Sequence, residues 1–92
     1  MKRRSPETFS GEGELRASGA STLASYAIEG DPHGLRPGST RLRGRLVTTA
    51  EAAAAAFQAT EGVLVLEDGL ELRAVMLAHT TGGCDVFVEL RK

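Results

Sequence analysis

Large side chains and cysteines are scarce in this chain of 92 residues. Aromatic residues make up 4% of it and tryptophan is absent, so branched aliphatic and alanine side chains must fill the core. The single cysteine, Cys84, excludes a disulfide within the chain and fits a reducing compartment. No window approaches the roughly 18 apolar residues that a membrane span requires. The sequence therefore predicts a soluble cytoplasmic protein that does not enter a membrane.

The composition is typical of a small globular domain. The chain is 41% hydrophobic and 25% charged, which is too apolar for a disordered segment. Its length predicts a single domain. We place this domain over residues 12–92, after a polar and mobile tail over residues 1–11 in which only Phe9 is expected to dock.

Charge is distributed unevenly, although the formal net charge is -1. Residues 1–45 hold eight basic and five acidic side chains, which gives +3, and residues 46–92 hold three basic and seven acidic ones, which gives -4. Opposite charges on neighbouring strands attract one another. The simplest interpretation is therefore that the two halves pair within one domain.

The last third of the chain carries the clearest pattern, that of three successive strands. They are predicted over residues 63–67, 70–77 and 84–91, with a turn over residues 80–83 before the last. Asp68-Gly69 joins the first two and is among the strongest signals for a two-residue hairpin turn.

That turn predicts the register of the hairpin. Glu67 lies opposite Leu70, and Val65 lies opposite Leu72, because side chains alternate with a period of two. With this register both faces of the three-stranded meander are apolar, so both need a cover.

One apolar face is left over after a helix covers the other. Either the first half of the chain closes over it as a barrel or sandwich, or a second copy of the chain covers it, since a soluble monomer rarely exposes so large an apolar patch. We expect the second arrangement, a homodimer. The predicted self-association residues are Leu64, Leu66, Val75, Leu77, Val86 and Val88.

Three further strands are predicted in the first half, over residues 14–17, 22–29 and 40–46. The middle one places three side chains on one face: Ala24, Tyr26 and Ile28. The last alternates cleanly, with Leu42 and Leu46 inward and three arginines, Arg41, Arg43 and Arg45, outward.

A helix is predicted between the two halves. Thr48 and Glu51 fit a capping box, five alanines follow, and Gly62 fits a left-handed cap at the end. Phe57 is the only bulky side chain of this segment, and we expect its ring at the centre of the core. The fold class is therefore α+β: two three-stranded antiparallel meanders joined by one alanine-rich helix, in the order β-β-β-α-β-β-β, as a curved sheet or partial barrel.

Binding residues are expected on a rigid loop and on the arginine strand. Residues 30–38 form a long turn-rich loop with two prolines, and loops of this kind often carry binding residues. Guanidinium groups about 7 Å apart on one strand face suit an acidic partner. We predict a small non-enzymatic interaction module whose surface for an acidic protein, or for a nucleic acid, consists of His33, Arg36, Arg41, Arg43 and Arg45.

Nucleic-acid binding by the arginine row is an alternative, because such a row can follow phosphates. Against it, no aromatic side chain is interleaved with the arginines to stack bases, and the domain is slightly acidic. A further alternative is thiol chemistry at Cys84, because a neighbouring imidazole such as His79 can deprotonate a thiol.

A purely structural interpretation of Cys84 and His79 is that the cysteine acts as a small hydrophobic side chain and that the histidine caps a strand end through a turn hydrogen bond. Asp85 points to the opposite face and does not supply a third catalytic group. No catalytic residue and no cofactor is therefore predicted.

No metal site is predicted either. The candidate ligands besides glutamates lack the paired spacing of structural zinc sites: His33, His79, Cys84, Asp31 and Asp85.

Overall fold

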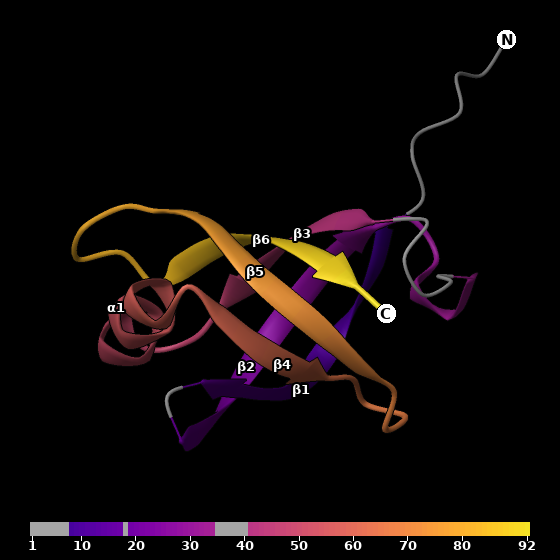
Figure 1. The fold of residues 1–92 in the computed structure, drawn as a ribbon, viewed down its shortest axis with the longest axis horizontal. Helices are drawn as coiled ribbons and strands as arrows, with labels where there is room; N and C mark the ends of the chain where they lie inside the picture. Colours follow the sequence, from indigo (N-terminus) through magenta and orange to yellow (C-terminus); the bar gives the residue numbers. More distant parts are fainter. Residues whose placement is uncertain (1–7, 18, 35–40) are drawn as a thin grey trace, which may run out of the picture.

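Six antiparallel strands close into a barrel in this protein (Figure 1). The computed structural model describes residues 8–17, 19–34 and 41–92. In chain order the elements are β1 (Thr8–Ala17), β2 (Ala20–Glu29), the 3-10 turn η1 (Pro32–Gly34), β3 (Leu42–Val47), α1 (Ala50–Ala59), β4 (Glu61–Val65), β5 (Glu71–His79) and β6 (Asp85–Arg91). The barrel order is β1-β2-β3-β6-β5-β4. The predicted antiparallel α+β fold with one helix is confirmed, and the expected curved sheet closes completely.

The barrel begins earlier in the chain than expected. β1 starts at Thr8, so residues 8–11 belong to the sheet and not to a tail. Phe9 docks there: its ring stacks on that of Tyr26 at a centroid distance of 6.3 Å and meets the edge of His33 at 5.4 Å. The rest of the predicted tail, residues 1–7, lies outside the described residues.

The barrel interior is lined by alternate side chains of all six strands. As predicted, Ala24, Tyr26 and Ile28 share the inner face of β2 and are at most 3% exposed. The largest fully buried side chains include Leu15, Ile28, Leu46, Leu64, Leu72, Leu90, Val86 and Val88. Burial of these aliphatic side chains supplies the main stabilisation of the fold.

The hairpin between β4 and β5 differs by one residue from the predicted one. The amide of Gly69 donates to the carbonyl of Leu66 at 2.9 Å, and the amide of Leu66 donates to the carbonyl of Leu70 at 2.8 Å, which closes a three-residue loop. Gly69 has a φ of +94°, the left-handed conformation that such a loop requires. Leu64 consequently lies opposite Leu72.

The predicted pairing of Glu67 with Leu70 is therefore wrong, and so is the pairing of Val65 with Leu72. A shift of one residue turns every side chain of a strand to the other face. In the observed register Leu64 of β4 and Leu72 of β5 point to the same side, into the barrel.

Closure by the first half of the chain changes the role of most of the predicted self-association residues. Four of them, Leu64, Leu66, Val86 and Val88, are at most 3% exposed because they fill the barrel core. They have no surface to offer a second copy. The other two face outward: Val75 is half-buried and Leu77 is 48% exposed.

A bulge in β5 explains the exposure of Leu77. Met76 lies opposite Val88, and Ala78 lies opposite Phe87, so that Leu77 is an extra residue between two cross-strand pairs. Two successive side chains, Leu77 and Ala78, then face solvent.

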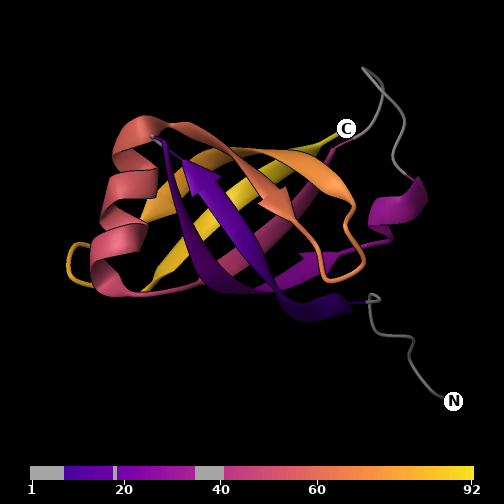
Figure 2. The same ribbon diagram turned by 90° about the horizontal axis from the view of Figure 1, so that it is seen from below.

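The helix α1 lies across one end of the barrel (Figure 2). Its N-cap is Thr49, whose side chain accepts from the amide of Ala52 at 3.1 Å, so the capping residue is one position later than the predicted Thr48. Its C-cap is Thr60, which has a φ of 68° and takes the left-handed position expected for Gly62. In the described part of the chain, no helix has the length and apolar character needed to cross a membrane.

Alanines, and not Phe57, form the buried face of α1. Ala53 and Ala56 close the barrel end and are 0% and 1% exposed. Phe57 is 38% exposed and packs beside His79 at a ring distance of 5.7 Å, so its predicted place in the core is wrong. Small side chains let a helix lie close to the strands that it covers, and the bulky ring of Phe57 lies at the margin of this contact, beside His79.

Two seams join the two meanders. In the long seam β3 pairs with β6 through six residue pairs, from Leu42 with Leu90 to Val47 with Asp85. In the short seam β1 pairs with β4 through three residue pairs. Together they leave no strand of the barrel without two neighbours.

Candidate partner-binding surface

The arginine strand forms part of the outer face of the barrel. Arg41 precedes β3, Arg43 and Arg45 lie on it, and all three are exposed, whereas Leu46 is fully buried. The expected alternation of β3 therefore holds, because one face of the strand meets the core and the other meets water.

Two of these arginines are held by acidic side chains across the long seam. Arg41 lies 3.6 Å from the carboxylate of Glu89, and Arg45 lies 3.4 Å from that of Asp85. Glu89 also accepts hydrogen bonds from Arg91, and these bonds, together with the charge of Arg41, hold the pKa of Glu89 below its usual value. The opposite charges of the two halves thus meet at this seam.

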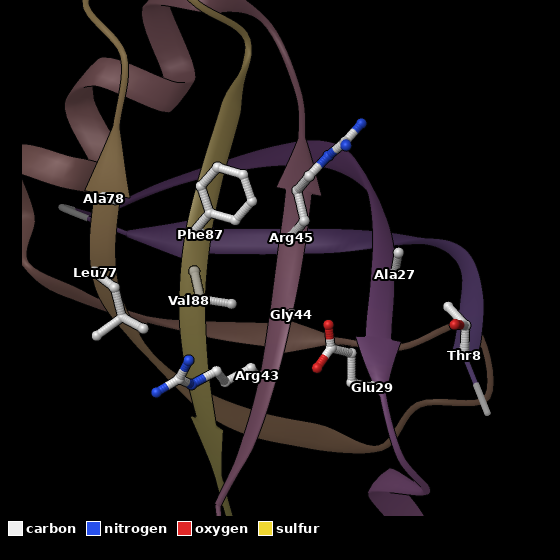
Figure 3. Close-up of a pocket in the computed structure, with 10 residues that line it drawn as sticks. All are labelled: Thr8, Ala27, Glu29, Arg43, Gly44, Arg45, Leu77, Ala78, Phe87 and Val88. Atoms are coloured by element: carbon white, nitrogen blue, oxygen red, sulfur yellow. The ribbon is translucent and has the colours of Figure 1, made fainter. Parts of the chain in front are cut away.

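Arg43 differs from its neighbours. Among the residues that the structure describes, no carboxylate lies within ion-pairing distance of its guanidinium group. Its cross-strand neighbours are Glu29 on β2 and Glu89 on β6. Figure 3 shows its side chain extending from β3 across β6 toward β5.

A groove of about 620 Å³ lies over this face, above β2, β3, β6 and β5 (Figure 3). Its charged walls include Glu29, Arg43 and Arg45, and its apolar walls include Leu77, Ala78 and Phe87. Phe87 is 47% exposed and lies directly opposite Arg45 in the long seam. A partner placed here meets guanidinium groups and apolar side chains at the same time.

The sequence prediction assigned only Arg43 and Arg45 of the groove to partner binding, and it did not assign the other walls, which include Glu29, Leu77, Ala78 and Phe87. The alternation of residues 84–91 indicates which way Phe87 points. It does not indicate that β6 lies next to β3, since the partner of each strand is set by the closure of the barrel.

His33 does not line the groove. It belongs to η1, which lies at the end of the barrel away from α1 (Figure 2), and two acidic side chains contact its ring. Its Nε2 lies 2.6 Å from the carboxylate of Asp68, and its Nδ1 lies 3.5 Å from that of Asp31. The hydrogen bond with Asp68 raises the pKa of His33 above its ordinary value, and the same bond lowers the pKa of Asp68. Arg36, predicted to act beside His33, lies outside the described residues.

Cys84 and His79 are not opposed across the second hairpin. Cys84 is exposed, and His79 lies opposite Val86. The Nε2 atom of His79 is 3.1 Å from the carbonyl oxygen of Gly83. This is a turn hydrogen bond of the kind that the purely structural interpretation of His79 predicts.

The described residues do not gather three or more histidine, cysteine, aspartate or glutamate side chains in a group suited to a metal ion. The fold and the groove together define a small closed barrel whose outer face carries arginine, carboxylate and apolar side chains. Comparisons of the chain with models of protein families, with curated proteins and with solved structures give no match.

Proposed function

We propose that this protein is a non-enzymatic binding module that holds an acidic partner against the outer face of β3 and β6. The observation that carries this proposal is Arg43, which is exposed, lines a groove and, among the described residues, has no carboxylate within ion-pairing distance, although Glu29 and Glu89 are its cross-strand neighbours. A guanidinium group presents its N–H donors in a planar fork that matches a carboxylate or a phosphate.

The apolar walls of the groove support the same proposal. Leu77 and Phe87 are each about half exposed, and arginine and aromatic side chains are enriched where proteins bind partners. A volume of about 620 Å³ is in the range of ligand sites. Because the groove is open, it suits a segment of a larger partner.

A single-stranded nucleic acid is the second candidate partner. Phe87 lies opposite Arg45, so an aromatic ring stands beside the arginine row that the sequence prediction took to lack one. Bases stack on such rings while guanidinium groups contact phosphates.

The homodimer stays a prediction, and it now depends on Val75 and Leu77, which face outward. Leu77 also lines the groove, so a second copy would compete with the acidic partner. Light scattering over a tenfold range of concentration tests it: a monomer throughout contradicts the dimer.

The binding proposal is tested with two probes, a glutamate-rich peptide and an oligothymidylate, at about 50 and about 200 mM salt. We expect at least one probe to bind, and Arg43→Gln to weaken it about fivefold. The matched control is Arg73→Gln, which changes an exposed arginine of β5 that does not line the groove. Equal effects of the two substitutions, or no binding of either probe at low salt, contradict the proposal.

A further inference from the structure

We infer that the acidic partner is an extended protein segment that presents one carboxylate and, two residues away, one apolar side chain. This inference rests on the binding function proposed above. It assigns Arg43 to the carboxylate and Phe87 with Leu77 to the apolar side chain.

The charges of the groove favour a single carboxylate over a chain of phosphates. A nucleic acid brings a phosphate at every nucleotide and needs a row of free cations. Here Arg41 and Arg45 are paired with Glu89 and Asp85, and Glu29 lines the groove. A polyanion would meet these carboxylates, whereas a single carboxylate needs only Arg43.

The spacing of the groove residues favours an extended segment. Arg43 lies opposite Glu89, which is two positions along β6 from Phe87, and Figure 3 shows that the side chain of Arg43 extends from β3 across β6. Positions two apart on a strand are separated by about 7 Å. An extended peptide repeats its side chains on one face at the same interval, so residues i and i+2 reach Arg43 and Phe87 together.

The bulge of β5 completes the apolar part of this surface. It turns both Leu77 and Ala78 to the outside, with Ala78 opposite Phe87. A leucine or similar side chain set between Leu77 and Phe87 removes apolar surface of both molecules from water. The nearby apolar groups also strengthen the contact between Arg43 and the carboxylate, because they exclude water from it.

The test is a nuclear magnetic resonance titration of the full chain with a seven-residue probe. The peptide has glutamate at its third and leucine at its fifth position, in a serine and threonine background. We expect amide shifts at Arg43, Gly44 and Phe87. Replacing the glutamate by glutamine, or the leucine by alanine, is expected to weaken binding about fivefold.

Protein variants separate the two parts of the recognition. Arg43→Gln is expected to remove the preference for the glutamate peptide over the glutamine peptide, and Arg73→Gln is expected to keep it. Leu77→Ser is expected to remove the preference for leucine over alanine. Its control is Leu23→Ser, at a side chain of β2 that is 80% exposed and does not line the groove.

The outcomes distinguish this inference from the proposed function. Equal affinity for the glutamate and glutamine peptides overturns the inference. So does Arg43-dependent binding of an oligothymidylate that is tighter than binding of the peptide, although this second result leaves the acidic-partner function standing. If neither probe binds even at low salt, both proposals are wrong.

Discussion

The long and short seams close the same barrel in different ways. The long seam joins β3 and β6 by six residue pairs, while the short seam joins β1 and β4 by three. At the short seam the strands also approach more closely than a side chain permits. A Cβ atom at Gly13 would collide with the carbonyl oxygen of Val65, and one at Gly62 would lie 2.5 Å from that of Arg16.

Side chains continue the closure where the ladder of the short seam ends. The amide of Glu12 donates to the carboxylate of Glu67 at 3.1 Å, and the amide of Glu67 donates to the hydroxyl of Tyr26 at 3.2 Å. The ring of His33 contacts the carboxylate of Asp68, which lies next to Glu67 in the loop between β4 and β5. All three contacts tie β1, β2 or η1 to the loop between β4 and β5, at the end of the barrel away from α1 (Figure 2).

The comparison separates an outer surface, to which we assign partner binding, from a junction on which the stability of the fold depends. Backbone hydrogen bonds close the long seam, so its outward side chains are free to carry charge and to line the groove. The short seam depends on two glycines and on particular side chains. We therefore expect substitutions at the short seam to change stability and substitutions on the outside of the long seam to change binding.

The largest effect on stability is expected from Gly13→Ala. The new methyl group is driven against the carbonyl of Val65, so β1 and β4 must separate. A loss of about 2 to 4 kcal/mol in the free energy of unfolding is expected, measured by urea denaturation. The control is Gly34→Ala, where the nearest atom lies 3.9 Å away. A similar loss for both variants would show that the short seam is not the sensitive junction.

A smaller loss is expected from Tyr26→Phe. This change removes the hydroxyl that accepts from the amide of Glu67 and leaves the buried ring in place. The loss of one such hydrogen bond costs about 1 kcal/mol. Hydrogen exchange provides the local measurement, and the amide of Glu67 should exchange faster in the variant. An unchanged rate would show that the Tyr26 hydroxyl does not help to close the barrel.

Arg45→Gln, on the outside of the long seam, is expected to cost less than about 0.5 kcal/mol. Its ion pair with Asp85 is half exposed, with 53% and 41% of the two side chains accessible. The same denaturation experiment checks this value. If Arg45→Gln destabilises the protein more than Tyr26→Phe does, the stability of the fold does not depend more on the short seam than on the outside of the long seam.

The smallest effect on stability is expected from the titration of His33 with Asp68, because both side chains are exposed. The pKa of His33 is raised, so its contribution is complete below the unfolded value of about 6.5 and is lost as the pH rises through the folded value. The pKa of Asp68 is lowered, so its contribution is complete above about 3.9 and is lost as the pH falls through the folded value. The contact therefore stabilises most between these limits.

Resonances of the His33 ring measure this contact directly. The midpoint of the titration is expected above the value of a free histidine, and Asp68→Asn is expected to lower it. Asp31→Asn should lower it less, because the hydrogen bond that the His33 ring donates to Asp68 is the main cause of the shift. A midpoint that does not respond to Asp68→Asn contradicts the contact.

The sequence predicts which side chains of an element face the core better than it predicts which elements lie next to one another. Clean alternation is enough to place Arg43 and Arg45 outside and Leu46 inside, because a period of two leaves no other arrangement. Asp68-Gly69 is less decisive. A two-residue turn and a three-residue loop both use a glycine with positive φ. The two registers differ by one residue, so they turn opposite faces of β5 toward the core.

Contacts between distant segments could not be predicted. Residues 42–47 and 85–91 pair in the long seam, but alternating strands fit one another equally well in several registers. The position of Phe87 beside Arg45, and with it the apolar half of the groove, follows only from barrel closure. Phe57 was placed wrongly for a related reason: the sequence shows that α1 has one bulky residue, but the strands beneath it select the alanine face.

Leu77, the extra residue of the bulge in β5, can be changed without a change in the core, although it forms part of the groove. Met76 and His79 already have their partners on β6 with Leu77 left over, so a deletion of Leu77 would leave a continuous ladder and the same inner side chains. The barrel would close as before, but one hydrophobic wall of the outer face would be gone. A variant of this chain can therefore exchange, add or lose an outer side chain at this one position without a change in the core, and such a change would alter the ligand preference of the proposed binding groove.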